Sequence, residues 1–158
     1  MEHTIKKGRH YGWHFFKIFF TKNSILKYDV TFTPSCLYSF GDVDDFDVNK
    51  LFGRSFGMHH QDSVRFGWRP DKNKIAIFSY TYTNGKRDMN QLFTCDIGKK
   101  YTMSMDCKEN LAILEIVYNQ SKIRYAVDVL SKKKWGYKLY PYFGGNKTAP
   151  QDVNIYLD

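Results

Sequence analysis

The sequence lacks the features of several large protein classes. Cysteine is rare: Cys36, Cys95 and Cys107 are an odd number without paired-ligand spacing, which argues against a disulfide scaffold and a structural zinc site. A reducing cytoplasm is therefore the expected setting. The apolar run near the N-terminus is short, is interrupted by Lys17 and precedes no small-residue cleavage site, so we expect neither a signal peptide nor a membrane span.

Enzyme motifs are missing as well. There is no P-loop, no G-x-G-x-x-G motif opening a helix and no G-x-S-x-G elbow. Glutamate is limited to Glu2, Glu109 and Glu115, which disfavours the paired carboxylates of a retaining glycosidase. The acidic run GDVDDFDV lacks the EF-hand pattern and is read as a surface loop rather than a calcium site. The sequence thus favours a non-catalytic protein with no cofactor and no bound metal.

What the sequence does contain is a series of short segments in which apolar and polar residues alternate. No window keeps a 3.6-residue apolar period, and the best helix candidate, SILKYDV, is weakened by its β-branched residues. Many short strands at even spacing are typical of a sandwich, a jelly roll or a barrel. We predict one all-β domain over residues 1–158, with strands at Trp13–Phe20, Leu26–Thr33, Lys50–Met58, Ser63–Arg69, Lys74–Thr83, Lys86–Cys95, Tyr101–Asp106, Leu111–Tyr118, Lys122–Val129, Trp135–Tyr142 and Val153–Leu157.

Two turns predict how the central strands pair. Asn84-Gly85 is typical of a two-residue hairpin turn, because both positions need positive φ. It pairs Thr83 with Lys86, Tyr82 with Arg87, Tyr80 with Met89 and Phe78 with Gln91. A loop at Pro70–Asn73 would pair Trp68 with Ile75, Phe66 with Ile77, Val64 with Ser79, Gly67 with Ala76, Arg65 with Phe78 and Ser63 with Tyr80.

These pairings divide the strands into an apolar side and a side rich in arginine and aromatic residues. Val64, Phe66 and Trp68 form the apolar side, which we assign to the core. The other side gathers the candidate ligand-binding residues Arg65, Arg69, Phe78, Tyr80, Tyr82 and Arg87 around a depression at Gly67 and Ala76. Guanidinium groups bind phosphate or carboxylate, and tyrosine offers a flat face for a base or a sugar ring. The alternative is a solvated outer face with weak cation–π contacts.

Two further segments supply candidates for the same site. Adjacent residues of a strand point to opposite sides, so one of His59 and His60 is expected on the arginine side, and we assign His60 to the ligand. The segment WGYKLYPY is expected to form a neighbouring strand. It would place Lys138 and Tyr140, followed by Tyr142, beside the arginines.

Several motifs resemble those of a family of small uncharacterised proteins of phages and gut bacteria. They are a His-His pair, then SVRFGWR, YTYTNG, WGY and PYFGGNKTAP, over roughly residues 50 to 158. The resemblance implies a lectin-like jelly roll, that is, a two-sheet antiparallel (concanavalin A-like) sandwich. It implies no established activity, so no catalytic residue follows from it. The resemblance does not extend to the first fifty residues.

Charge suggests the class of ligand. A net charge of +8 and a pI near 9.3 favour an acidic partner, although scattered lysines also simply aid solubility. The leading hypothesis is non-catalytic binding of a small anionic, nucleotide-type ligand. A phage protein of this kind would sequester a host immune signalling nucleotide in the host cytoplasm. The alternatives are a carbohydrate-binding lectin-like module and a virion component that forms a homo-oligomer through the aromatic side; a histidine-dependent phosphodiesterase is least favoured.

Overall fold

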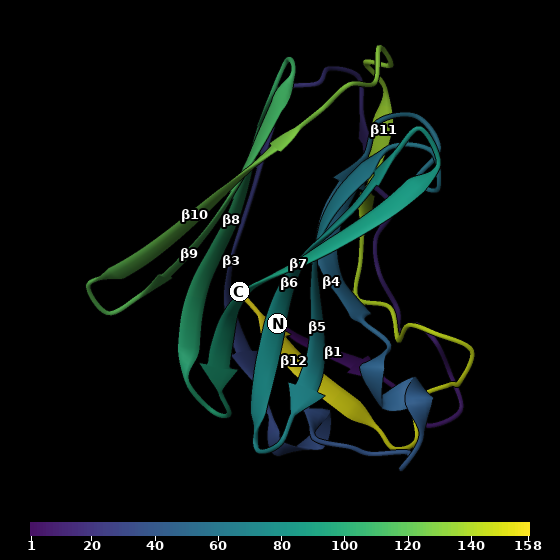
Figure 1. Cartoon of the computed structure of the whole chain (residues 1–158), viewed down its shortest axis with the longest axis vertical. Helices are drawn as coiled ribbons and strands as arrows, with labels where there is room; N and C mark the ends of the chain where they lie inside the picture. The colour runs from purple at the N-terminus through teal and green to yellow at the C-terminus, as the bar shows by residue number, and fades with distance from the viewer.

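Two six-stranded antiparallel sheets lie face to face in the computed structural model, which describes all 158 residues (Figure 1). Sheet A contains, in spatial order, β1 (Glu2–Ile5), β12 (Val153–Leu157), β3 (Ser24–Phe32), β8 (Lys100–Lys108), β9 (Leu111–Tyr118) and β10 (Ser121–Asp128). Sheet B contains β2 (Ile18–Phe19), β11 (Gly136–Leu139), β4 (Asn49–Ser55), β5 (Ser63–Asp71), β6 (Lys74–Thr83) and β7 (Lys86–Asp96). The predicted all-β, two-sheet antiparallel architecture is confirmed.

Helix is limited to two single 3-10 turns, η1 (Pro34–Cys36) and η2 (Val43–Phe46). Neither is long and apolar enough to cross a membrane. The helix candidate SILKYDV instead forms most of β3, where its β-branched residues suit the pleated backbone.

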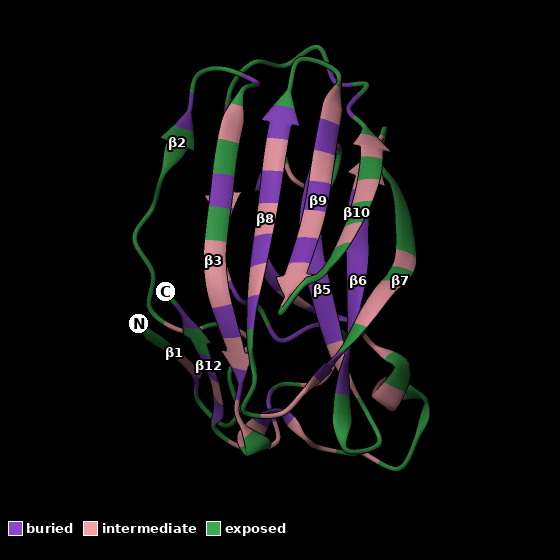
Figure 2. Cartoon of the chain, turned by 90° about the vertical axis from the view of Figure 1, so that its left-hand side faces the viewer, coloured by how far each residue is buried: buried purple, intermediate pink, exposed green.

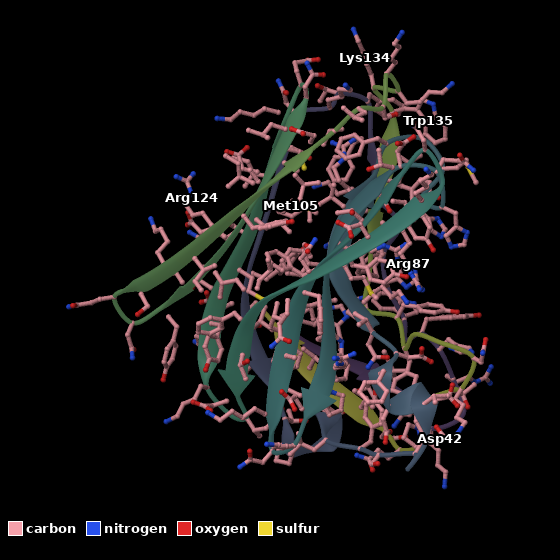
Figure 3. The ribbon with its side chains drawn as sticks, in the orientation of Figure 1. Asp42, Arg87, Met105, Arg124, Lys134 and Trp135 are labelled. Carbon is pink, nitrogen blue, oxygen red and sulfur yellow. The ribbon has the colours of Figure 1, made fainter.

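The core fills the space between the sheets. Successive strand residues point to opposite sides, so burial alternates along the strands of sheet A in Figure 2. Met105 of β8 lies between the two sheets (Figure 3), and the rings of Phe32 and Trp68 meet there with their centroids 5.6 Å apart. Val64 and Phe66 belong to the same buried cluster, so the predicted apolar side of β5 is confirmed.

All three cysteines are unpaired and lie in this core. Burial raises the pKa of Cys36 to about 12 and that of Cys107 to about 11. Because the thiolate is the reactive form, these thiols are inert at neutral pH and act as small apolar side chains.

The hairpin β6–β7 has the predicted register, with Thr83 opposite Lys86 and Tyr80 opposite Met89. Asn84 and Gly85 both take positive φ, as the turn requires. The predicted register of β5 and β6 is wrong by two residues. β5 continues through Pro70 and Asp71, and the chain turns at Lys72 and Asn73, so Arg65 lies opposite Tyr80 rather than Phe78.

The N-terminal region departs most from the prediction. The expected strand Trp13–Phe20 is reduced to the two residues of β2, and the strand Glu2–Ile5 was not predicted. β1 and β2 are edge strands of different sheets, and the chain between them runs along the open edge of the sandwich (Figure 2). Alternation alone could not show that most of this aromatic segment finds no partner strand.

Candidate ligand-binding site

The predicted arginine side is the outer face of sheet B, which points away from sheet A. Arg65 and Tyr80 are register partners on β5 and β6, and the Arg65 guanidinium carbon lies 5.6 Å from the Tyr80 ring centroid. A shift of two residues keeps every side chain on its side of the sheet, so the predicted faces survive the register error. Figure 3 shows Arg87 of β7 on this outer side as well. Tyr82 packs beside Tyr80, with the two ring centroids 6.0 Å apart.

The depression predicted at Gly67 and Ala76 is filled. A Cβ atom on Gly67 would lie only 2.5 Å from Val48 Cγ1, so the valine occupies the space that the glycine leaves. Val48, Ala76 and Phe78 form a small buried cluster here with Tyr80. The hollow predicted in the middle of the sheet is therefore wrong.

Arg69 is separated from Arg65 by this cluster. Its guanidinium carbon lies 5.0 Å from the Phe78 ring centroid, and its Nη1 donates a 2.8 Å hydrogen bond to the carbonyl oxygen of Phe46. Phe46 is the last residue of η2, which precedes β4, so Arg69 fastens that 3-10 turn to the sheet. The structure thus brings Arg65, Tyr80 and Tyr82 together and places Arg69 and Phe78 in a separate stack.

The actual hollow lies on the other side of Arg65, toward β11. It measures about 320 Å³ and is called the Arg65 cavity here. Its floor is formed by sheet B, and one wall is formed by the extended N-terminal segment between β1 and β2. The side chains that line it include Arg65, His59, Tyr137 and Tyr142, together with Tyr11 and Phe16 from the N-terminal segment.

Arg65 is a buried cation without a counterion. Only 6% of the residue is exposed, its Nε has no hydrogen-bond partner, and it takes part in none of the ion pairs of the chain. Burial lowers its pKa, and the surrounding tyrosines oppose this effect. Buried charges are normally paired because desolvation is costly. An unpaired guanidinium in a cavity is therefore suited to receive an anion with forked donors.

Lys50 of β4 adds a second cation that sequence analysis missed. Its Nζ lies 4.6 Å from the Tyr80 ring centroid and donates a 3.0 Å hydrogen bond to the Val48 carbonyl oxygen. Burial, Arg65 and Arg87 lower the pKa of Lys50 to about 8. A lysine whose pKa is lowered by neighbouring arginines lies in a positive electrostatic potential. The outer face of sheet B is therefore positively charged around Lys50 and Arg65.

His59, and not His60, lines the Arg65 cavity. The expected strand Lys50–Met58 ends at Ser55, and both histidines lie in the turn that follows, so strand alternation does not apply to them. His59 Nδ1 lies 2.6 Å from the Tyr137 hydroxyl oxygen. His60 is exposed and does not line the cavity; its ring centroid lies 5.5 Å from that of Tyr82.

Burial lowers the pKa of His59 to about 4, with smaller effects from Arg65 and His60. As the pH falls from 6.5 toward 4, the unfolded chain takes up a proton at this position and the folded chain does not. The free energy of unfolding should therefore decrease as the pH falls through this range. His59→Gln should show a shallower decrease, measured by urea unfolding at several pH values. Equal slopes for the variant and the wild type would contradict the lowered pKa.

Lys138 and Tyr140 line the Arg65 cavity, but, contrary to the prediction, they do not share the face of sheet B that carries Arg65. Lys138 is opposite Arg54 in β4, so it shares the inner side of the sheet, and its Nζ lies 4.7 Å from the ring centroid of Tyr28 in sheet A. Tyr140 stays on the side of Lys138, whose Nζ lies 4.8 Å from its ring. The alternation then breaks at Pro141, which cannot donate a ladder hydrogen bond.

On the Arg65 side, β11 and the chain that follows it contribute Tyr137, which was not predicted there, and Tyr142, which was. Tyr142 forms an isolated bridge with Lys50 after the end of β11. Pro141 in the sequence was the one available signal that the alternation could not be extended to Tyr142. For Tyr11 and Phe16 no signal existed, because they reach the cavity only through the path of the N-terminal segment.

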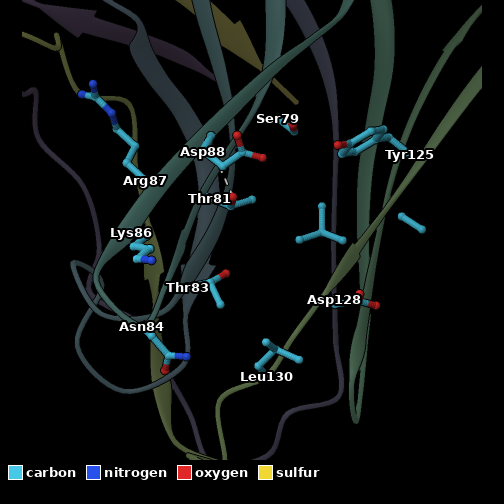
Figure 4. Close-up of a pocket in the computed structure, with 12 residues that line it drawn as sticks. Ser79, Thr81, Thr83, Asn84, Lys86, Arg87, Asp88, Tyr125, Asp128 and Leu130 are labelled. Atoms are coloured by element: carbon cyan, nitrogen blue, oxygen red, sulfur yellow. Dashed lines mark hydrogen bonds between the residues drawn. The ribbon is translucent and has the colours of Figure 1, made fainter.

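A second hollow, of about 470 Å³, lies where the sheets diverge between the β6–β7 hairpin and β10 (Figure 4). The inner side of β6 changes here from isoleucine to Ser79, Thr81 and Thr83, so the core does not extend to this end. Asp88 and Asp128 line the hollow with Lys86, and the side chain of Arg87 points away from it in Figure 4. The hollow therefore lacks the positive surplus of the Arg65 cavity.

The chain holds no group of three or more metal-ligating side chains. In the acidic loop, Asp42 and Asp44 both pair with Lys147, at 2.6 Å and 3.0 Å. No aspartate or glutamate lines the Arg65 cavity.

Comparisons with known proteins find structural similarity but no sequence similarity. No protein-family profile matches the chain, and no curated protein matches its sequence. The alginate lyase of Klebsiella pneumoniae superposes with a TM-score of 0.63 at 10% identity, over 86% of this chain and 59% of that chain. The family 7 alginate lyase A1-II' superposes with a TM-score of 0.50 at 13% identity, over 94% and 62%. The carbohydrate-binding module CBM66 from Bacillus subtilis gives 0.46 at 8% identity, over 98% and 82%.

Identities at this level show the fold alone. The predicted jelly-roll (concanavalin A-like) sandwich is confirmed. The chain spans less than two thirds of the length of either lyase. No sequence family is identified, so the resemblance to proteins of phages and gut bacteria stays a prediction.

Proposed function

We propose that this protein binds an acidic glycan, with a carboxylate or sulfate group of one sugar held by Arg65. The observation that carries the proposal is the buried guanidinium without a counterion, which faces a cavity of about 320 Å³. A carboxylate or sulfate group would pair with it through two parallel hydrogen bonds, and Lys50 supplies additional positive potential.

The walls of the cavity suit the rest of a sugar. The tyrosine and phenylalanine rings that line it offer apolar faces for the C–H side of a pyranose ring, while phenol hydroxyls reach its hydroxyl groups. The fold supports the same ligand class, because the structurally similar proteins include two alginate lyases. The neutral imidazole of His59, which is hydrogen-bonded to the Tyr137 hydroxyl, adds a further hydrogen-bonding group without adding charge.

A nucleotide-type ligand is the second candidate. The same guanidinium would bind a phosphate group, and the same rings would stack on a base. The role of a phage protein that sequesters a signalling nucleotide depends on this ligand and on the sequence resemblance. The glycan is preferred because the fold similarity to alginate lyases adds support that the nucleotide lacks.

Isothermal titration calorimetry with three matched ligands tests the proposal. Alginate oligosaccharides should bind, with an affinity that decreases as salt rises, because ion pairs at a partly open site are screened. A neutral oligosaccharide of equal length should bind at least about tenfold more weakly, since one lost charged hydrogen bond is worth roughly 1.5–3 kcal/mol. Equal binding of both sugars, or binding of a cyclic dinucleotide alone, would overturn the glycan proposal.

The oligomeric state distinguishes the virion-component alternative from glycan binding. A homo-oligomer assembled through the outer face of sheet B would cover Arg65 and leave no room for a ligand. Light scattering after size-exclusion chromatography, with and without alginate oligosaccharide, measures the mass. An oligomer whose mass is unchanged by the sugar, together with no heat of sugar binding in the titration, would favour the interface alternative.

A further inference from the structure

Another cavity, different from the hollow near β10, adjoins the Arg65 cavity across the N-terminal segment. It measures about 460 Å³ and is called the Lys138 cavity here. His14, Phe16, Lys138 and Tyr140 line both cavities, so the two hollows lie on either side of the same short stretch of chain. The ring of His14 stacks on that of Tyr140, with centroids 4.3 Å apart, and fixes this stretch against the sandwich.

Lys138 resembles Arg65 in lacking a counterion. Its ammonium group lies between the rings of Tyr28 and Tyr140, at 4.7 Å and 4.8 Å, and donates a hydrogen bond to the Tyr28 hydroxyl. It takes part in none of the ion pairs of the chain. Neither cavity is lined by an aspartate or a glutamate.

The mouth of the Lys138 cavity carries exposed aromatic rings. Trp13 is 71% exposed, Phe15 68% and Phe16 69%, and the Trp13 and Phe15 rings meet edge to face at 4.3 Å. Large apolar side chains clustered on a small domain mark a contact surface. Together with Tyr140 they form an aromatic ledge that passes from one cavity to the other.

We propose that the Lys138 cavity is a second anion subsite for the same glycan. An acidic oligosaccharide would cross the aromatic ledge with one acidic group on Arg65 and another, from a later sugar, on Lys138. This inference rests on the proposed function and specifies its ligand: a chain with acidic groups on more than one sugar, in contrast to a single acidic sugar. Two linked subsites raise the affinity without new contacts at either one, because the second binding event is intramolecular.

Calorimetry with alginate oligosaccharides of one to six residues tests the second subsite. The wild-type affinity should rise with chain length until both subsites are filled. Because Lys138 lines both cavities, the measured quantity is a difference: Lys138→Met should lower the affinity for the hexamer about tenfold or more beyond any loss for the monosaccharide. Lys138→Arg, which keeps the charge, should retain most of the gain with length. Lys27→Met, an exposed lysine on β3, is the matched control and should behave as the wild type.

The outcomes separate the inference from the proposed function. A wild-type affinity that does not depend on length, or an equal loss for monomer and hexamer in Lys138→Met, would overturn the second subsite while Arg65 binding stands. If no acidic sugar binds at any length, the proposed function fails as well. Because Lys138 also bonds Tyr28, Trp13→Ala provides an independent test: its side chain is exposed, so the fold should persist while the gain with length is lost.

Discussion

Replacing Arg65 by methionine should abolish binding of an acidic glycan and, at the same time, stabilise the ligand-free protein. Removing one partner of a buried charge pair costs roughly 2–5 kcal/mol, so the affinity should fall about 30-fold or more. Without ligand, however, the guanidinium is buried and its Nε unpaired. Methionine keeps an unbranched chain of similar length and removes the desolvated charge, so the free energy of unfolding should rise by about 1–3 kcal/mol.

Calorimetry and urea unfolding on the same preparations measure both effects. Arg124→Met is the matched control, because Arg124 is an exposed arginine on β10 in sheet A, and it should change neither quantity appreciably. Undiminished binding by the Arg65 variant would remove the proposed site. A marked loss of stability would instead show that Arg65 serves the fold.

Arg54 provides the opposite case, and its replacement by methionine should destabilise the protein by about 3–5 kcal/mol. Arg54 is fully buried on the inner side of β4, one strand away from Arg65. Its Nη1 donates hydrogen bonds of 3.0 Å to the carbonyl oxygens of both Thr21 and Lys22. Its guanidinium is held between the rings of Phe19 and Phe56, at 4.5 Å and 4.4 Å.

Methionine at position 54 would leave those two carbonyl oxygens without their donor and release the chain that leads from β2 to β3. Urea unfolding should show a lower midpoint, while glycan affinity measured well below that midpoint should change little. Arg54→Lys should recover only part of the loss, since a lysine ammonium cannot reproduce the planar fork of donors. An unchanged midpoint in Arg54→Met would show that the N-terminal connection needs no anchor.

The two arginines illustrate how a β-sheet separates stability from function. They occur in neighbouring strands of one sheet and point to opposite sides of it. The inner guanidinium donates to backbone carbonyl oxygens of its own chain through Nη1 and leaves only Nη2 without a partner, whereas the outer one leaves Nε unpaired beside an open cavity. A cost in stability at a binding site is a common consequence of keeping it ready for a ligand.

The pairing of β6 with β7 was predictable from the sequence because Asn84-Gly85 permits essentially one turn geometry. The pairing of β5 with β6 was not, because Pro70, Asp71 and Asn73 are all common turn residues and do not say which two positions form the turn. The hydrophobic pattern has a period of two, so it cannot detect an error of two residues.

The candidate site was predictable only in part, for related reasons. Arg65 and Tyr80 share a face because alternation along two paired strands requires it. Val48 fills the space at Gly67 because the chain before β4 packs against the sheet. The direction of the Lys138 side chain depends on the register of β11 against β4, which places Lys138 opposite Arg54. His59 reaches the cavity through a turn, where alternation has no meaning.

By itself, the sequence determined the all-β class, the turn at Asn84-Gly85 and the sorting of β5 and β6 into an apolar and a cationic-aromatic side. These properties follow from contacts between residues that are near in the chain or paired across one turn. Only the tertiary structure decided where the hollow lies, that Arg65 has an unpaired donor, and that the N-terminal segment and β11 complete its walls. Burial and counterions depend on segments far apart in the sequence, and no local pattern records how those segments come together.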